Sequence, residues 1–330
     1  MKHKIVALFL MAALLALPGC GNTPPTRQAP LQKVTVLLDW FPNTNHTGLY
    51  VAQQQGYYQA EGLDVEIIQP PEGGQVQLLA AGRGDFAISA QEEIIMARSQ
   101  GIPVVAVAAV IQHNTSGFAA PQDRGVKTPA DFEGKTYGGW GSPAEEAVLK
   151  SLMNKYQADF SKLKVLNIGS ADFFTSVQKD IDFAWIFWGW TGIEAELKNM
   201  PLSFISLREV EPRLDYYTPV LVSRENLLNS NPDLAKRFMK ATSRGYQYAI
   251  QDPDKAAEIL LGKIPELNRD LVINSQRYLA AQYQADASRW GEMQAGVWQG
   301  YADFMFENGL LSSQIDTAAA FSNDFLPAAQ

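Results

Sequence analysis

The amino-acid sequence predicts an α/β protein of two similar lobes, joined by two chain crossings that form a hinge, with a ligand cleft between the lobes. Segments typical of strands and helices alternate from Val34 onward, which indicates parallel βαβ units. The alternation begins again after Gly117, and the tripeptide Asp-Phe-Ala opens a predicted strand in each half. A chain of 330 residues is also longer than a single core usually supports.

The first half alternates predicted strands with predicted helices. The strands are rich in β-branched and other apolar residues, whereas the helices carry apolar residues at helical spacing and stop at glycines. We place strands at 33–40, 63–69, 85–90 and 102–112, and helices at 46–62, 73–84 and 91–101.

The second half repeats this order and then returns to the first. We place strands at 135–141, 164–169, 181–189 and 202–209, helices at 142–156, 170–180 and 190–200, a returning strand at 216–223 and a helical tail over 231–308. Residues 34–117 with 219–330 therefore form lobe 1, and 118–218 form an inserted lobe 2. A ligand is expected where the first strands of each lobe end, because α/β sheets bind ligands at the carboxyl ends of their strands.

The first nineteen residues have the features of a secretory signal peptide. Lys2 and Lys4 precede the apolar run 5–17, which is too short to span a bilayer. The run ends in LPGC, which resembles a lipoprotein lipobox, and Cys20 is the only cysteine. We therefore expect signal cleavage after residue 19, a lipid on Cys20 that anchors the protein to the extracytoplasmic side of a membrane, and a Pro-rich tether at 20–33. The alternative is a secreted protein in which this cysteine is incidental.

Charge and composition exclude several classes of function. The chain has 35 acidic and 27 basic side chains, which argues against a nucleic-acid partner. Its three histidines, His3, His46 and His113, are too few and too scattered for a metal site. The sequence contains no nucleophile–base pair, phosphate loop or dinucleotide fingerprint, so no catalytic residue and no cofactor are predicted.

Three stretches carry a resemblance to a known family: LDWFPNTNHTGLYVAQQQGYYQAEGLDV, YGGWGSPAEE and FWGWTGIEAE. They resemble binding proteins of the periplasmic type for thiamine-precursor pyrimidines, within a wider group that also binds sulfonates, nitrate and riboflavin. The resemblance implies the type II periplasmic-binding-protein fold. It also implies a monomer that captures an aminopyrimidine and passes it to the permease and ATPase subunits of an ABC importer.

Tryptophans are the candidates to hold the flat face of such a ligand. Trp40 and Trp140 each lie at the end of a predicted strand segment and precede a proline and a helix, so we expect them to face each other across the cleft. Trp188 is a third candidate. The alternative for any tryptophan is core packing, which is the stronger interpretation for Trp185 inside its apolar strand. Glycines on both sides of Trp140 favour a binding role there.

A carboxylate is expected to accept hydrogen bonds from the amine at the edge of the ligand. The resemblance implies Glu194 for this role, with Glu92 or Glu93 as the rival. Ser142 is a predicted N-cap whose capping box is closed by Glu145, and amides at that helix start are candidates to hold a polar group of the ligand. Further candidates to contact the ligand are Asn43, His46, Tyr50, Gln91 and Tyr217. Asn43 has the alternative role of helix cap.

Two alternatives remain for the function. The first keeps the binding role and changes the ligand to riboflavin, a sulfonate or another heterocycle. The second is a pyrimidine-precursor synthase of the same superfamily, which consumes a bound pyridoxal phosphate. In those enzymes a lysine and a histidine stand where this chain has Ser89 and Glu93, and their cysteine-rich stretch is replaced by DYYTPVLVS. The enzymatic alternative is therefore disfavoured.

Overall fold

A computed structural model of the chain describes residues 30–70, 74–169 and 171–328. The predicted signal peptide, Cys20 and nearly all of the predicted tether lie outside the described residues. The first strand begins at Gln32, inside the range expected for the tether. Among the described helices, none has the length and apolar character that crossing a bilayer requires.

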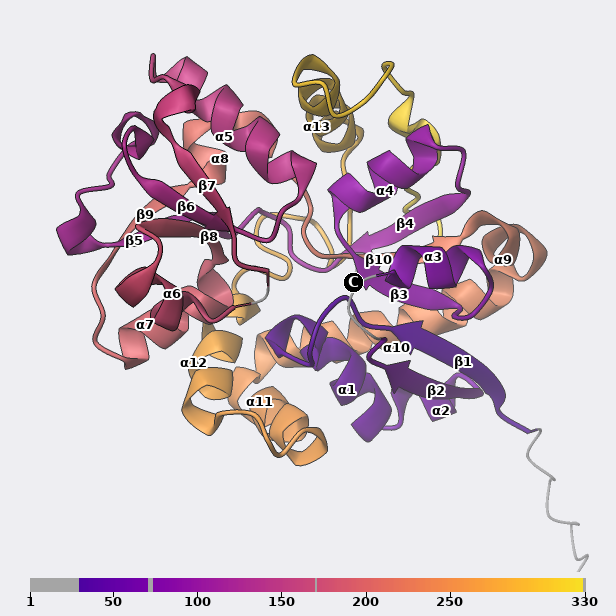
Figure 1. The fold of residues 1–330 in the computed structure, drawn as a ribbon. Coiled ribbons are helices and arrows are strands. Elements are labelled where there is room, and N and C mark those ends of the chain that lie inside the picture. Colours follow the sequence, from indigo (N-terminus) through magenta and orange to yellow (C-terminus); the bar gives the residue numbers. More distant parts are fainter. Residues whose placement is uncertain (1–29, 71–73, 170, 329–330) are drawn as a thin grey trace, which may run out of the picture. The chain divides into compact units, whose positions relative to one another are not determined.

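Two five-stranded sheets organise the chain from Leu31 onward (Figure 1). In the first sheet the order is β2-β1-β3-β10-β4, where β1 pairs in parallel with β2 and β3, and β10 runs antiparallel between β3 and β4. These strands are β1 (Gln32–Leu37), β2 (Leu63–Ile68), β3 (Phe86–Ser89), β4 (Val104–Ala109) and β10 (Val220–Arg224). We refer to this sheet and its helices as lobe 1.

The second sheet, which belongs to lobe 2, has the order β7-β6-β8-β5-β9. Here β6 pairs in parallel with β7 and β8, while β5 runs antiparallel between β8 and β9. Its strands are β5 (Ser116–Pro121), β6 (Thr136–Gly139), β7 (Lys164–Asn167), β8 (Phe183–Phe187) and β9 (Leu202–Ser206). The α/β class with two similar sheets is confirmed. The expected parallel βαβ units are present in both sheets, and each crossing strand enters its new sheet antiparallel to its neighbours.

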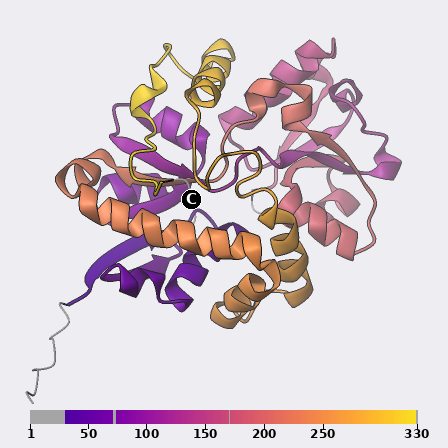
Figure 2. The same cartoon turned by 180° about the vertical axis from the view of Figure 1, so that it is seen from behind.

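Helices cover both faces of the lobe 1 sheet, and the long α10 runs across the back of it (Figure 2). One face packs on α1, α2 and α10 through side chains such as Val36 and Phe238, and the other packs on α3, α4 and α13 through Leu37 and Ile94. These helices are α1 (Thr47–Gln54), α2 (Tyr57–Ala60), α3 (Gln75–Ala80), α4 (Gln91–Ser99), α9 (Glu225–Ser230), α10 (Pro232–Gln251) and α13 (Ala295–Glu307). Burial on both faces explains why these strands are almost continuously apolar.

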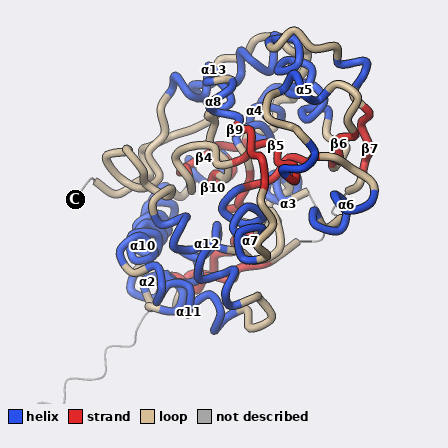
Figure 3. Tube along the Cα trace, turned by 90° about the vertical axis from the view of Figure 1, so that its left-hand side faces the viewer, coloured by secondary structure: helices blue, strands red, loops and turns tan. Residues whose placement is uncertain are grey.

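The lobe 2 sheet is likewise enclosed. Phe118 and Trp185 face α5, while Ala119 and Ile186 face α6 and α7. The helices here are α5 (Pro143–Lys155), α6 (Phe173–Lys179), α7 (Ile193–Leu197) and α8 (Leu207–Val210). Two tail helices, α11 (Pro253–Lys263) and α12 (Arg269–Ala280), extend lobe 1, and Figure 3 shows α12 beside α7 of lobe 2.

Two connections between the sheets are tied to each other at the hinge. The chain passes from β4 to β5 through residues 110–115 and returns from β9 to β10 through residues 207–219. Asn114 of the first connection donates its backbone N–H to Asp215 of the second at 2.8 Å. His113 lies 2.7 Å from the same carboxylate, which joins the crossings directly. The predicted lobe boundary at residues 117 and 118 falls inside β5, since that strand begins at Ser116.

One predicted helix is divided in the structure. A single helix was expected over 46–62, but the chain forms α1 and α2 with Gly56 between them in the left-handed region, at φ 70°. Glycine adopts this conformation without steric cost, so the helix direction changes there while the apolar spacing continues.

Candidate functional site

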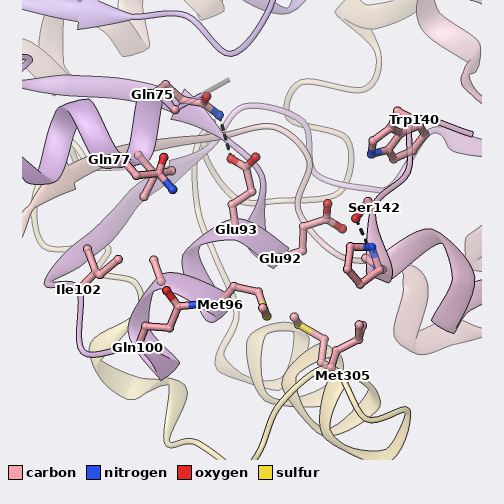
Figure 4. Close-up of a pocket in the computed structure, with 16 residues that line it drawn as sticks. Gln75, Gln77, Glu92, Glu93, Met96, Gln100, Ile102, Trp140, Ser142 and Met305 are labelled. Carbon is pink, nitrogen blue, oxygen red and sulfur yellow. Dashed lines mark hydrogen bonds between the residues drawn. The ribbon is translucent and has the colours of Figure 1, made fainter. Parts of the chain in front are cut away.

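A cavity of about 400 Å³ lies between the two lobes and has the size of a small-ligand site (Figure 4). It is bounded by the starts of α3 and α4 in lobe 1, the start of α5 in lobe 2 and the end of α13. We call it the cleft cavity. Its lining residues are Gly74, Gln75, Val76, Gln77, Glu92, Glu93, Met96, Ala97, Gln100, Ile102, Trp140, Ser142, Pro143, Ala144, Met305 and Leu310.

The position of the cleft cavity follows from the topology. The helices α3, α4 and α5 come directly after the parallel strands β2, β3 and β6, so their first turns lie at the carboxyl ends of the sheets. Ligands of open α/β sheets bind there. Three residues predicted from sequence line it, Glu92, Trp140 and Ser142, together with the rival carboxylate Glu93.

Two glutamates occupy the first turn of α4, where the helix dipole favours negative charge. Gln91 precedes them and is buried, so it does not line the cleft cavity. Its Oε1 accepts from the Tyr217 N–H at 2.9 Å, and its Nε2 donates to the Val297 carbonyl at 3.2 Å. Gln91 therefore fixes the start of α4 to the returning chain and to α13.

Glu92 is held on its inner side by two phenols. The hydroxyls of Tyr216 and Tyr301 donate to its Oε2 at 3.3 and 3.2 Å. Burial first, and then the charges of Glu93 and Glu145, raise the pKa of Glu92 to about 7, although the two hydroxyls lower it. This carboxyl can therefore gain or lose a proton near neutral pH.

Glu93 projects into the cleft cavity beside Gln75, as Figure 4 shows. Its Oε2 accepts from Gln75 Nε2 at 2.8 Å and from the hydroxyl of Ser89. Burial is the largest cause that raises the pKa of Glu93, and the charge of Asp39 adds to it, whereas the Ser89 hydrogen bond lowers it. Every hydrogen bond that these two carboxylates receive comes from a neutral donor of the described chain.

The predicted capping box at the start of α5 is confirmed. Ser142 Oγ accepts from the Ala144 N–H at 3.2 Å, and Glu145 Oε2 accepts from the Ser142 N–H at 2.9 Å. The other oxygen, Glu145 Oε1, accepts from the Trp140 N–H at 3.1 Å and from the Tyr137 hydroxyl at 2.6 Å. One buried carboxylate therefore fixes the whole turn from β6 to α5.

Trp140 presents its indole to the cleft cavity. It is 45% exposed, and its ring contacts Trp185 at 5.5 Å between centroids with the planes at 61°. Trp185 is only 8% exposed and belongs to the lobe 2 core, which confirms the interpretation of that residue as packing. The open face of Trp140 is available for stacking on a planar ligand.

The corresponding turn of lobe 1 lies outside the lining of the cleft cavity. Trp40 is 50% exposed, and its aromatic partner is Phe41 at 5.7 Å. Asn43 accepts from the Asn45 N–H at 2.8 Å as a helix cap, the alternative role that the sequence left open. The structure thus shows each of Trp40 and Trp140 with an aromatic neighbour from its own lobe, and not with each other.

His46 is fully buried behind that turn. Its Nδ1 accepts from the Asn43 N–H at 3.2 Å, and its Nε2 donates to Asp39 Oδ1 at 2.8 Å. This arrangement places the ring proton on Nε2 and holds the end of β1 against the start of the helix. Since both ring nitrogens are used inside the chain, His46 has no nitrogen left for a ligand.

Tyr50 and Tyr217, which were predicted to contact a ligand, do not line the cleft cavity. Tyr50 packs among apolar side chains of α11 and α12, and burial together with Glu266 raises its pKa to about 12. Tyr217 is buried, and its hydroxyl accepts from the Gln294 N–H at 2.9 Å. Both serve the fold because their positions behind the strand ends are covered by the helical tail.

Trp188 and Glu194 follow β8 and lie outside the lining of the cleft cavity. Trp188 lies in the π-helix Trp188–Gly192 and packs on Phe204 at 4.8 Å, beside a separate and more open pocket of about 240 Å³. The Glu194 carboxylate pairs with Lys198 one turn later on α7, at 3.1 Å. In this structure the rival carboxylates Glu92 and Glu93, rather than Glu194, line the cleft cavity.

Several lining residues escaped prediction from sequence. Gln75 and Gln77 begin α3 after the glycine pair 73–74, and the rule that placed a site at the start of α5 would have found them. Met305 and Leu310 come from the end of α13 and the turn after it. No local pattern marks those two residues, because their position depends on how the tail packs on both lobes.

The carboxylates of the cleft cavity do not belong to a cluster of metal ligands within the described residues. Within those residues, no three or more His, Cys, Asp or Glu side chains form a group that could hold a metal ion. The donors on Glu92 and Glu93 are hydroxyls and an amide, which leaves the carboxylates free to act as acceptors.

Known proteins resemble this chain over most of its length. A family model described as NMT1/THI5 like matches residues 43–256. A formylaminopyrimidine-binding protein of Halalkalibacterium halodurans is 30% identical and covers 98% of both chains. The riboflavin-binding protein RibY of Chloroflexus aurantiacus is 26% identical and covers 99% of both chains. A 4-amino-5-hydroxymethyl-2-methylpyrimidine phosphate synthase of Legionella pneumophila is 25% identical over 72% of this chain and 76% of its own.

Among solved structures, the alkanesulfonate-binding protein SsuA of Xanthomonas axonopodis has a similar fold, with a TM-score of 0.66 and 16% identity. The match covers 89% of this chain and 99% of that one. The type II periplasmic-binding-protein fold expected from the sequence is thus confirmed. At this identity the likeness concerns the fold alone.

Proposed function

The chain belongs to the NMT1/THI5-like family, and we propose that it is an extracytoplasmic binding protein for an aminopyrimidine of the thiamine-precursor type. The full-length relative that binds formylaminopyrimidine supports this ligand class, and so does the chemistry of the cleft cavity. The protein would capture the pyrimidine between its lobes and present it for uptake.

One observation carries the proposal. The cleft cavity combines an exposed indole, Trp140, with the two carboxylates Glu92 and Glu93, and none of its described lining residues is lysine, arginine or histidine. A sulfonate or phosphate would place a negative charge beside two carboxylates without a basic partner, which is electrostatically unfavourable. An aminopyrimidine instead offers N–H donors at its edge and a π face for stacking.

We place the ligand with its face on Trp140 and its exocyclic amine toward Glu93. Glu92 is suited to the neighbouring ring nitrogen, because a carboxyl whose pKa lies near 7 donates when protonated and accepts when ionised. Gln75 and Gln77 supply amide groups at the rim. In a closed cleft, an analogue that leaves one of these groups without a partner would bind more weakly by about 1–3 kcal/mol.

The cellular setting is part of the same proposal. A signal peptide over residues 1–19 and a lipid on Cys20 would attach the protein to the outer face of a membrane, and the permease of an ABC importer would receive the ligand. We propose no catalytic role for this chain. Ser89 stands where the related synthases have a lysine, and in the structure its hydroxyl is used to hold Glu93.

A titration calorimetry series tests the ligand and the carboxylate together. The proposal predicts saturable binding of formylaminopyrimidine or hydroxymethylpyrimidine by the purified protein, and weaker or absent binding of riboflavin and alkanesulfonates. Glu93→Gln should weaken pyrimidine binding about tenfold or more, because a lost charge-assisted hydrogen bond costs roughly 1.5–3 kcal/mol.

Glu194→Gln is the matched control, as it removes a carboxylate that pairs with Lys198 outside the cleft cavity. Its affinity should stay within about twofold of the parent protein, as surface ion pairs contribute little. A large loss in Glu194→Gln with no loss in Glu93→Gln would move the ligand from the cleft cavity to the segment after β8. Tight binding of a sulfonate in place of any pyrimidine would refute the ligand class.

A further inference from the structure

The start of α5 lies at the cleft cavity, and the start of a helix is a favourable place for an anion. The first N–H groups of a helix have no partner within it, and the helix dipole adds partial positive charge. In this chain Ser142, Pro143 and Ala144 line the cleft cavity at that point. An anionic ligand would be expected to use them if they were free.

These amides are already occupied by the chain. The N–H groups of Trp140 and Ser142 donate to Glu145 at 3.1 and 2.9 Å, and that of Ala144 donates to Ser142 Oγ. Pro143 has no N–H to offer. The carboxylate of Glu145 therefore stands where the acid group of a bound anion would otherwise accept these hydrogen bonds.

The neighbouring residues are shaped around this carboxylate. Glu145 is 3% exposed, and the buried hydroxyl of Tyr137 is its third donor at 2.6 Å. A Cβ added to Gly139 would come within 2.5 Å of Glu145 Oε1, so the absence of a side chain there leaves the space that the carboxylate fills. Burial, and then the charge of Glu145, raise the pKa of Tyr137, which keeps that hydroxyl protonated as a donor.

We propose that Glu145 is a specificity-determining residue that acts as a built-in anion: it closes the start of α5 to anionic ligands and orients Trp140 toward the ligand. The inference rests on the proposed function in one respect, that the cleft cavity is the ligand site. Specificity here comes from the hydrogen bonds that the chain already makes, since an acid group in the cleft cavity would find the amides of Trp140 and Ser142 bound to Glu145.

Substitution of Glu145 by alanine should turn the occupied position into an anion site. Glu145→Ala frees the amides of Trp140 and Ser142 and leaves space for a small acid. We expect acetate or methanesulfonate to raise the melting temperature of this variant in a saturable way at millimolar concentration, measured against chloride at equal ionic strength. The parent protein should show no such difference. Pyrimidine affinity should fall about tenfold in the variant and recover in part with acetate, because the added carboxylate restores the turn.

Glu145→Gln is the matched control, because it removes the charge but fills the space, and it should weaken pyrimidine binding without any response to acetate. Glu146→Ala removes a neighbouring carboxylate that pairs with Lys150 on the helix surface, and it should resemble the parent. If Glu145→Ala does not fold, Glu145→Ser serves for the same measurement.

The inference is overturned if folded Glu145→Ala or Glu145→Ser shows no acetate-specific stabilisation, or if the parent protein shows the same stabilisation. The anion measurement uses no pyrimidine, so it stays decisive even if no pyrimidine binds to the parent. That last result would refute the proposed function and leave the role of Glu145 to be judged from the anion response.

Discussion

The turns that follow β1 and β6 are built on the same plan and serve different ends. Each turn places a tryptophan after the strand, then a proline, and enters its helix through a capping box. In lobe 1 the box is Asn43 with His46, and in lobe 2 it is Ser142 with Glu145. The two boxes differ in their closing residue, a neutral imidazole in one and a carboxylate in the other.

The closing residue decides what else each box can hold. His46 has one nitrogen left after capping and uses it on Asp39, so the turn is fixed to the end of β1. Glu145 has a second oxygen that accepts two hydrogen bonds, and one of them comes from the Trp140 backbone. For this reason the lobe 2 box sets the position of its own tryptophan, which lines the cleft cavity, while Trp40 lies outside the lining.

The largest difference between the boxes should appear in stability. We expect His46→Ala to lower the free energy of unfolding by roughly 2–4 kcal/mol, because it leaves the Asn43 N–H and Asp39 without partners and opens a cavity behind the turn. Urea unfolding followed by circular dichroism measures the change. Asn45→Ala in the same turn is the control, with an expected loss below about 0.5 kcal/mol. Equal losses in the two variants would show that the imidazole does not hold the turn.

A smaller difference between the two turns is expected in ligand binding, where the lobe 2 turn should have the larger effect. Trp140→Ala should weaken pyrimidine binding by about 1.5–2 kcal/mol, a factor of ten to thirty, because it removes both stacking and buried apolar area. Trp40→Ala should cost less than about 0.7 kcal/mol if the ligand is held as the cleft cavity suggests. Titration calorimetry on both variants decides the point. A larger loss in Trp40→Ala would mean that closure of the lobes brings that indole onto the ligand.

The same turns show how far the sequence alone could reach. The capping box of Ser142 and Glu145 was predictable because its pattern is local, and so were the carboxylates at the start of α4. The antiparallel strand β5 was not foreseen, since Ser116–Pro121 contains no β-branched residue and pairs only through contacts with β8 and β9. Tyr301 and Met305 reach the site from the tail, and no sequence spacing encodes that approach.

Glu194 illustrates a different limit. Its assignment came from a resemblance, which transfers a role by alignment but does not test the surroundings of the side chain. In the structure, Lys198 one turn later on α7 pairs with its carboxylate. Glu92 and Glu93, by contrast, receive only neutral donors in the described chain, and burial raises the pKa of both. Surroundings of this kind become visible only once the chain is folded.

The smallest expected effect is a pH dependence of stability, which arises from Glu92 on α4 and is modified by Glu145 of the lobe 2 box. The pKa of Glu92 is about 7 in the folded protein, raised by burial and then by Glu93 and Glu145, whereas an unfolded glutamate titrates near 4.5. Between these values the folded protein binds more protons than the unfolded chain, so its stability should fall as pH rises. We expect a fall of about 1 kcal/mol between pH 5 and pH 8, because Glu92 is only half-buried and solvent screens part of the effect.

Denaturant unfolding of the parent and of Glu92→Gln over this pH range measures the effect. In Glu92→Gln the free energy of unfolding should depend much less on pH, since the glutamine side chain has no proton to exchange at that position. In Glu145→Gln the slope should shrink by a smaller amount, because the charge of Glu145 is a lesser cause of the raised pKa than burial. If the free energy of unfolding depends on pH equally in Glu92→Gln and in the parent protein, a group other than Glu92 binds the proton. If the pH dependence of stability changes in Glu92→Gln but not in Glu145→Gln, the charge of Glu145 does not contribute to the raised pKa of Glu92.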